Sequence, residues 1–403
     1  MLNDKCIPIC VPDEDPFYRN YGVKCLNFVR SVTTPRDDCS LGHAEQMNTV
    51  TSYLDGSQVY GSDAKTAYKL RKKCGGRLKE ETMTNCKKGF LPSVDDKAAV
   101  CDLRNMSEPC YLAGESYLRY YGISPTSLYS HSYNEEVNPG IINGFGAGAF
   151  RFLHTMIPDS IMTCSSSYQV AYLYKMSDYY FNPSIVEANR ESFDDIVRGT
   201  VTQPASESDP FVTREITNLL FKTRDKWGMD LIAMDIQRGR DHGIASYNDY
   251  RETCGLKRAM CFQDLLGEIP QDRINALSQI YECVDDVDLF VGGAMERDVR
   301  GSILGQTFQC IIAEQFYRTR IGDRFFYDNG EMPHSFTPEQ LKELKKASMA
   351  RLICDNTEGV KFIQKKAFEI ESPYNPKYSC EDCENIPRVD LTAWKRPKFE
   401  LFD

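Results

Sequence analysis

Residues 228–256 read GMDLIAMDIQRGRDHGIASYNDYRETCGL and set an unusually charged run beside apolar residues. The charged and titratable side chains near the middle of this segment are Asp235, Arg238, Arg240, Asp241 and His242. Taken alone, the segment is compatible with a buried cluster of ion pairs at the start of a helix, because charged groups that leave water need partners. Its function therefore has to be interpreted together with the rest of the chain.

The composition places the chain among well-packed globular proteins. It has 403 residues, a formal net charge of −10, 41% hydrophobic residues, 21 Phe and 23 Tyr, which together exclude extensive disorder. At about 150 residues per domain the length allows two to three domains or one large one. The acidic balance argues against a nucleic-acid partner. No run approaches the roughly 18 apolar residues of a membrane-spanning helix.

The cysteines indicate an oxidising compartment. Sixteen are scattered along the chain without paired CxxC clusters, and only five histidines accompany them. This pattern is typical of disulfides and not of zinc sites, so we expect a secreted protein. The first residues, MLNDKCIPIC, contain no apolar signal region. We therefore expect that the start of the protein is missing from this sequence.

Hydrophobic periodicity predicts a mainly α-helical fold with long cross-linked loops. Residues 1–45 are rich in Pro and Cys and are predicted to form a clamped loop region. Small residues and regularly spaced Phe150, Leu153 and Ile157 predict a closely packed helix over residues 140–157. The other expected helices cover residues 45–54, 65–71, 212–221, 301–316 and 337–352. The last of these opens with Thr337-Pro338-Glu339, an N-cap followed by Pro at the first helical position.

Two further segments carry candidate ligands, and each has an ordinary structural interpretation. Thr51, Tyr53, Asp55 and Ser57 alternate within NTVTSYLDGSQVYGSD, as oxygen ligands around Ca²⁺ would, although such a junction is more often capping chemistry. His154 lies on the predicted apolar helix one turn after Arg151. A lone histidine there is usually a core residue, and the alternative is an axial ligand of haem iron.

Six strings together resemble the animal haem peroxidases, and they occur in that family's order. They are LDGSQVYGS, FRFLHTMIP, QPASESDPF, MDIQRGRDHG, VDDVDLFVGG and FQCIIAEQF. The resemblance covers nearly the whole chain, and IQRGRDHG together with the LHTMIP segment is highly specific. It implies one partial peroxidase domain over residues 1–403, with packed helices around haem b, a calcium loop and a C-terminal tail from about residue 381.

The resemblance also assigns roles to single residues. His154 matches the proximal ligand of haem iron, and Asp235 matches the position that accepts a hydrogen bond from the other imidazole nitrogen. Many members of the family have Asn there, and a carboxylate is expected to lower the iron potential. Arg151 and Arg238 match arginines near the haem propionates. His242 matches a structural member of the RGRDHG run. Thr51, Tyr53, Asp55 and Ser57 match the calcium ligands.

The residues that act on peroxide are expected to be absent from this chain. In the family the distal histidine lies on a helix before the CIPI segment, and the distal arginine follows a CFxAGD motif. Here CYLAGES runs directly into YLRYYGISP, so an internal segment is expected to be skipped between Ser116 and Tyr117. His43, His131 and His334 do not lie at positions from which they would replace the distal histidine. No catalytic residue is therefore assigned.

The resemblance implies disulfides Cys254–Cys310, Cys354–Cys380 and Cys101–Cys110. Pairs Cys6–Cys25, Cys74–Cys86 and Cys261–Cys283 are plausible by position. The expected function is oxidation of a phenolic, tyrosyl or halide donor by hydrogen peroxide, in a response to oxidative stress. The alternative is a haem-binding pseudo-enzyme or secreted scaffold without turnover. The sequence makes no prediction about the oligomeric state.

Overall fold

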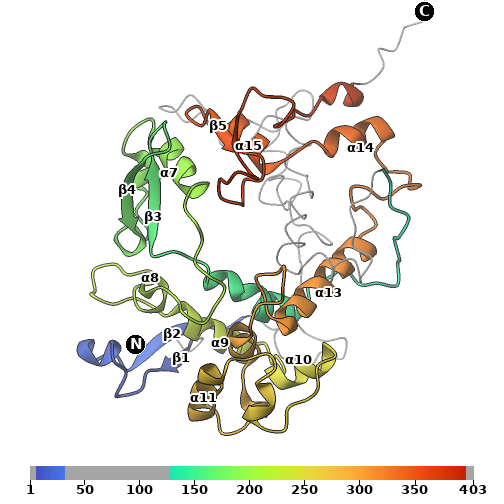
Figure 1. The fold of residues 1–403 in the computed structure, drawn as a ribbon. Helices are drawn as coiled ribbons and strands as arrows, with labels where there is room; N and C mark the ends of the chain where they lie inside the picture. Colours follow the sequence, from blue (N-terminus) through green and yellow to red (C-terminus); the bar gives the residue numbers. More distant parts are fainter. Residues whose placement is uncertain (1–5, 32–127, 396–403) are drawn as a thin grey trace, which may run out of the picture. The chain divides into compact units, whose positions relative to one another are not determined.

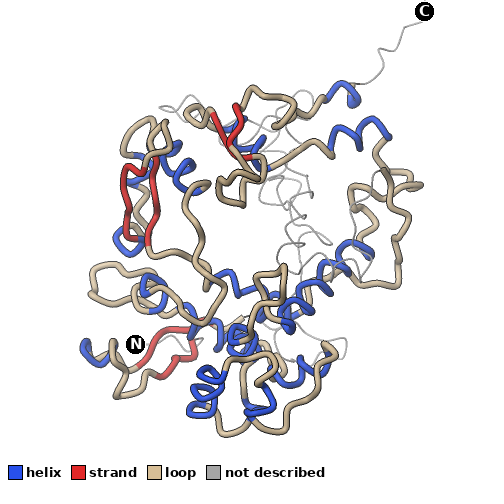
Figure 2. The backbone as a smooth tube through the Cα atoms, viewed as in Figure 1, coloured by secondary structure: helices blue, strands red, loops and turns tan. Residues whose placement is uncertain are grey.

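The computed structural model describes residues 6–31 and 128–395. Several predictions fall outside these residues: the helices over 45–54 and 65–71, the calcium segment with Thr51, Tyr53, Asp55 and Ser57, the Ser116–Tyr117 join, His43, and the pairs Cys74–Cys86 and Cys101–Cys110. Within the described residues, the fold is mainly helical with little sheet, as predicted. Figure 2 shows short helices joined by long loops.

The chain divides into two compact units. The described part of the first comprises residues 6–31 and 141–317, and that of the second comprises residues 128–140 and 318–395. Helix α13 (Gln306–Gly322) carries the chain from the first unit into the second (Figure 1).

The first unit contains most of the secondary structure. Its strands are β1 (Cys6–Cys10), β2 (Cys25–Val29), β3 (Ser160–Cys164) and β4 (Val170–Lys175). Its α-helices are α6 (Ser184–Glu187), α7 (Ser192–Thr200), α8 (Arg214–Thr217), α9 (Leu231–Asp241), α10 (Tyr247–Thr253), α11 (Gln271–Ile280) and α12 (Leu289–Met295). Short helical turns are η1 (Tyr18–Tyr21), η4 (Gly144–Gly148), η5 (Ala149–His154), η6 (Met176–Asp178), η7 (Phe262–Leu265) and η8 (Val284–Asp286).

The described part of the second unit contains two helices, a hairpin and a final turn. These are α14 (Pro338–Leu344), α15 (Met349–Asn356), β5 (Phe362–Gln364), β6 (Lys377–Ser379) and η9 (Leu391–Trp394). Every sheet in the described part of the chain is an antiparallel pair: β1 with β2, β3 with β4, and β5 with β6.

The main core of the first unit packs η4, η5, α12 and α13 together. Its buried residues are Phe145, Ala149, Phe152, Leu289, Phe290, Leu304, Phe308, Ile311 and Ile312. The expected close packing by small residues is confirmed, because a Cβ on Gly144 would lie 2.3 Å from the Tyr250 hydroxyl oxygen. The predicted single helix over 140–157 is instead one π-helical turn followed by a 3-10 helix, and Leu153 is 38% exposed.

The N-terminal residues form a hairpin where a clamped loop was predicted. β1 and β2 pair antiparallel with Cys10 opposite Cys25 and Cys6 opposite Val29. A disulfide needs Cα atoms less than about 7 Å apart, whereas Cys6 and Cys25 stand four positions out of register along strands that rise about 3.4 Å per residue. The predicted Cys6–Cys25 bridge is therefore wrong for this register.

Two predicted helices are shorter or broken. Over residues 212–221 only α8 is helical, because Leu220 leaves the helix to pair with Met229 in an isolated bridge and Phe221 adopts φ +58°. Over residues 337–352 the Thr337 cap and the Pro at the first turn are confirmed. The chain then stops and restarts at Ser348, whose side chain caps α15 by accepting from the Arg351 N–H.

Two predicted disulfides are confirmed, one in each unit. Cys254–Cys310 ties the end of α10 to α13, and Cys354–Cys380 ties α15 to the residue after β6. Cys261 and Cys283 are both exposed and unbonded, so their predicted bridge is wrong for this structure. They instead occupy the N-cap positions of η7 and η8.

Candidate functional site

Arg151 and His154 stand on one face of η5. A 3-10 helix has three residues per turn, so side chains three apart in sequence lie above one another. Both side chains contact Asp235, which lies on the neighbouring helix α9. The 3-10 geometry of this segment therefore brings together three of the four residues that were predicted to bind haem.

Asp235 is fully buried, with 0% of its surface exposed. Its Oδ1 accepts a hydrogen bond from Arg151 Nη1 at 2.7 Å, and its Oδ2 lies 2.5 Å from His154 Nδ1. An ionised carboxylate can only accept, so the imidazole proton is assigned to Nδ1 and the lone pair to Nε2. The arrangement thus favours the tautomer protonated at Nδ1, whose Nε2 lone pair can bind a metal.

The β1–β2 hairpin holds the other end of α9. Arg238 lies over the Phe28 ring, 4.3 Å from its centre, and donates to Ser31 Oγ at 3.0 Å. Asp241 accepts from Arg30 Nε at 2.6 Å and from the Ser31 N–H at 2.9 Å. The hairpin and this end of α9 are therefore connected by a hydrogen-bonded network.

His242 is a structural residue, as the resemblance implied. It is 4% exposed, and its ring nitrogens lie 2.7 Å from Ser31 Oγ and 3.1 Å from Asn143 Oδ1. With both nitrogens engaged by side chains of the fold, this imidazole joins the hairpin to the segment before η4.

The surroundings of α9 favour negative charge on Asp241 and disfavour positive charge on Arg238. Burial alone would raise the pKa of Asp241, but the Ser31 N–H and the Arg30 guanidinium outweigh it and lower that pKa. Burial, followed by the nearby Arg151 cation, lowers the pKa of Arg238. Because Arg238 and Arg151 repel each other, this part of the site disfavours further positive charge.

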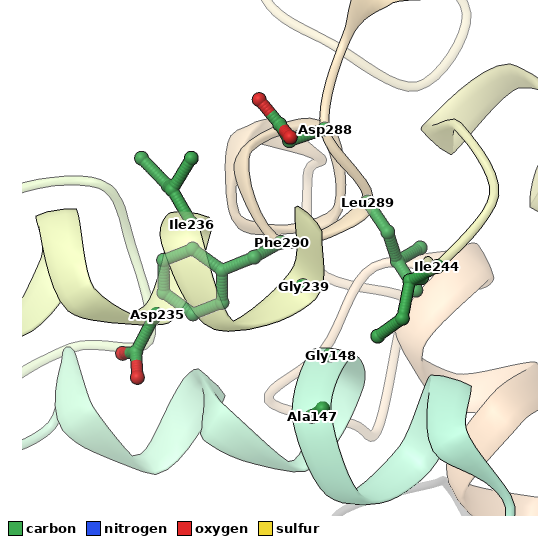
Figure 3. A pocket seen from close by; sticks show the side chains of 9 residues that line it. All are labelled: Ala147, Gly148, Asp235, Ile236, Gly239, Ile244, Asp288, Leu289 and Phe290. Carbon is green, nitrogen blue, oxygen red and sulfur yellow. The ribbon is translucent and has the colours of Figure 1, made fainter. Parts of the chain in front are cut away.

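A small pocket of about 10 Å³ lies beside Asp235, between η4, α9 and the start of α12. This is roughly the room for one water molecule. In Figure 3 the Asp235 carboxylate points away from Ile236 and Asp288, which also line the pocket. Asp288 itself accepts two hydrogen bonds from Arg240, at 2.9 and 2.7 Å, and one from the Tyr281 hydroxyl.

The residues present fit a haem group on two observations. His154 Nε2 makes no hydrogen bond within the described residues, and 28% of the side chain is exposed, so a metal can reach this nitrogen. Arg151 Nε is buried and has no acceptor in the described part of the chain. An anionic oxygen such as a haem carboxylate would satisfy this donor.

The described residues do not test every part of the predicted site. Arg238 contacts Phe28, Ser31 and Asp241, so its approach to a propionate stays a prediction. No cluster of three or more His, Cys, Asp or Glu side chains suited to a metal occurs in residues 6–31 and 128–395, and the calcium residues lie outside them.

Sequence reasoning missed the hairpin residues that hold α9. Arg30, Ser31 and Phe28 follow Cys25 in the string CLNFVRS, in which Leu26 and Phe28 alternate with Asn27 and Val29. Leu26 and Phe28 are buried and the other two are exposed. This period-two alternation is a strand signal, and it would have predicted β2.

The sequence profile of the family described as animal haem peroxidase matches residues 1–120 and 114–368. The chain belongs to this family. The peroxidase of Drosophila melanogaster is 35% identical over 96% of the chain and 66% of its own length. The chorion peroxidase of the same organism is 32% identical over 97% of the chain and 56% of its own length.

A solved structure agrees with this assignment. Peroxidase A from Dictyostelium discoideum aligns with a TM-score of 0.69 and 25% identity, and the alignment covers 91% of this chain and 82% of the Dictyostelium chain. The chain thus spans about 56 to 66% of the two Drosophila relatives.

The family matches are interrupted inside the chain. The two matched stretches of the family profile meet at residues 114–120, which is where a family segment was expected to be skipped. The alignment with the Drosophila peroxidase runs over 460 positions, more than the 403 residues of this chain. The relative therefore has residues within the aligned range that this chain lacks.

Proposed function

We propose that this chain binds haem b through His154 and belongs to a protein that uses hydrogen peroxide to oxidise a small reducing substrate. The donor would be phenolic, tyrosyl or halide, in a response to oxidative stress. The observation that carries the proposal is the contact of Asp235 with both His154 and Arg151, which leaves Nε2 open to a metal. Haem, when bound, supplies the redox chemistry with peroxide.

The role of Asp235 is to orient the imidazole and increase its electron donation. A carboxylate that accepts the Nδ1 proton makes the ring a stronger donor at Nε2. We therefore expect a lower iron reduction potential than an amide at this position would give. Because Asp235 is fully buried, water does not compete for this hydrogen bond.

The role of Arg151 and Arg238 is to hold the carboxylates of haem. A guanidinium pairs strongly with a carboxylate, and Arg151 Nε is the buried donor that lacks an acceptor. We assign no catalytic residue in this chain, and propose that the distal base and cation that act on peroxide come from other segments of the whole protein.

The remaining assignments follow from the family. Thr51, Tyr53, Asp55 and Ser57 are proposed to bind Ca²⁺, since they offer oxygen ligands. The two disulfides support export to an oxidising compartment, and we propose that the protein is secreted. No helix among the described residues is long and apolar enough to cross a membrane.

The test is a spectroscopic titration of the chain with haemin. We expect a shifted Soret band of a histidine-ligated haem, its loss in His154→Ala, and a higher reduction potential in Asp235→Asn. His334→Ala is the matched control, because that imidazole is exposed and bonded to the Arg324 carbonyl. Unchanged spectra in His154→Ala would refute the ligand assignment.

Peroxidase activity is tested separately, by guaiacol oxidation with peroxide. Turnover well above free haemin supports the peroxidase for this chain itself. Haem binding without such turnover would restrict this chain to the proximal half of the site, so that activity would have to be sought in the whole protein.

A further inference from the structure

Three tyrosines form a contacting group on the surface of the first unit. Tyr172 and Tyr174 lie on β4, and Tyr179 follows η6 directly after that strand. The ring centres of Tyr172 and Tyr174 are 4.4 Å apart, and those of Tyr174 and Tyr179 are 5.2 Å apart. We call these three residues the tyrosine group.

The strand explains why the rings meet. Alternate residues of a strand point to the same face, so Tyr172 and Tyr174 are neighbours on one face of β4. β4 pairs with β3 alone among the described residues, and Figure 1 shows the two strands as a separate hairpin. Tyr172 is 58% exposed, and Val170 and Leu173 on the same strand are more than half exposed.

The hydroxyls of the tyrosine group differ from those of tyrosines that support the fold. Tyr247 donates to Glu296, Tyr281 to Asp288 and Tyr180 to the Glu215 carbonyl. None of the three hydroxyls in the tyrosine group makes a hydrogen bond within the described residues. Their hydroxyls are therefore not committed to a structural hydrogen bond in this part of the chain.

We propose that Tyr172 and Tyr174 form a site of one-electron oxidation at which the chain cross-links to itself as dityrosine. Haem, if bound as proposed, would let hydrogen peroxide act as the oxidant, and each phenol would lose one electron to that oxidant and one proton to water. The two phenoxyl radicals then join through a carbon–carbon bond between ring positions next to the hydroxyls. The two ring hydrogens leave as protons while the phenols re-form, and one hydrogen peroxide is reduced to two waters. The inference rests on the proposed function, which supplies the oxidant.

Geometry selects the Tyr172–Tyr174 pair over Tyr174–Tyr179. Coupling needs two ring edges side by side, and the first pair has the shorter distance and an angle of 48° between ring planes. The second pair meets edge to face at 89°, which directs one ring edge at the middle of the other. Tyr179 therefore shields the pair on one side and does not couple.

The experiment oxidises the full chain in two ways and maps the product by peptide mass spectrometry. One sample is the haem-loaded chain with hydrogen peroxide, and the other is the haem-free chain with a photo-excited ruthenium complex and persulfate. Both are expected to give a peptide of residues 152–175 that has lost two hydrogen atoms. Its fragment ions between Tyr172 and Tyr174 should be missing, and dityrosine fluorescence should appear.

Matched variants identify the residues. Tyr172→Phe and Tyr174→Phe should each abolish the intramolecular product, whereas Tyr179→Phe should leave it. Tyr374→Phe is the control, because Tyr374 is 97% exposed and has no ring neighbour in the described part of the chain. Coupling that involves Tyr374 as readily as the β4 pair would overturn the inference, since exposure alone would then decide the product.

The two oxidants separate the inference from the proposed function. A cross-link with the ruthenium oxidant but not with peroxide leaves the pair assignment standing and counts only against peroxidase turnover by this chain itself. Oxidation of guaiacol by peroxide without the Tyr172–Tyr174 product overturns the inference and leaves the peroxidase standing. Absence of the product with the ruthenium oxidant also overturns it.

Discussion

Replacing Asp235 by Asn tests whether the carboxylate charge holds the proximal site together. The carboxylate accepts from Arg151 at 2.7 Å and from His154 at 2.5 Å, whereas an amide has only one accepting oxygen. If that oxygen stays on His154, the amide NH₂ faces the Arg151 donor. One hydrogen bond to a charged group is then lost, which costs about 1.5–3 kcal/mol.

The exposure of Asp235 and Arg151 determines where in this range the loss of unfolding free energy should fall. Asp235 is fully buried, but 26% of the Arg151 side chain is exposed, so water recovers part of the loss. We expect the haem-free Asp235→Asn chain to lose about 2 kcal/mol of unfolding free energy. Asp235→Ala removes both contacts and leaves a partly buried cation, so about 3–5 kcal/mol is expected.

The assay is urea unfolding of the haem-free chains followed by far-UV circular dichroism. Asp13→Asn is the control, because Asp13 and its partner Lys24 are 79% and 71% exposed. Water and salt screen such an exposed pair, so its loss should leave the urea midpoint close to that of the wild type. If Asp235→Asn and Asp13→Asn unfold at the same urea concentration, the Asp235 carboxylate does not stabilise the site and the reasoning is refuted.

Three further outcomes follow from the structure. Gly144→Ala should cost about 1–3 kcal/mol in the same urea assay, because its Cβ would lie 2.3 Å from the Tyr250 hydroxyl, and a wild-type midpoint would contradict this. Replacing both cysteines of Cys254–Cys310 by Ser should lower the unfolding free energy by about 4.2 kcal/mol, and the same change at Cys354–Cys380 should lower it by about 3.5 kcal/mol, because the first disulfide closes the longer loop. A larger loss for the Cys354–Cys380 variant would show that loop entropy does not decide the difference. Burial raises the pKa of Glu296 above its ordinary 4.5, so the protonated side chain contributes fully to stability below that pH, and this contribution is lost as pH rises through the higher folded value. The urea midpoint of the wild type relative to Glu296→Gln should therefore fall as pH rises above 4.5, and parallel curves for the two proteins would contradict it.

The sequence was most informative where a motif fixes a local geometry. Thr337 and Pro338 start α14 as predicted, because capping and the fixed φ of proline act within one turn. The same pattern failed to show that the chain restarts at Ser348, since a serine inside an apolar periodic run gives no signal that its side chain will cap a new helix. Local propensity decides the first case and packing decides the second.

The sequence predicted which residues form the candidate site, but it did not predict the contacts that hold them in place. His154, Arg151 and Asp235 were predicted from the resemblance, and the structure shows that all three are in contact. That Arg30 and Ser31 hold Asp241 could not be inferred, because these contacts join residues more than 200 positions apart. Such contacts depend on the β1–β2 register, which was predicted as loop.

These connections imply that the site proposed to bind haem is already formed in the haem-free chain. The hydrogen bonds that fix His154 run to Asp235, and those that fix α9 run to the β1–β2 hairpin, so all of them lie within the first unit. Haem bound as proposed would therefore meet an imidazole whose tautomer is already set, and little ordering of these side chains would remain to oppose binding. The haem-free stability of the Asp235 variants and their haem affinity should consequently change together, because one set of contacts determines both.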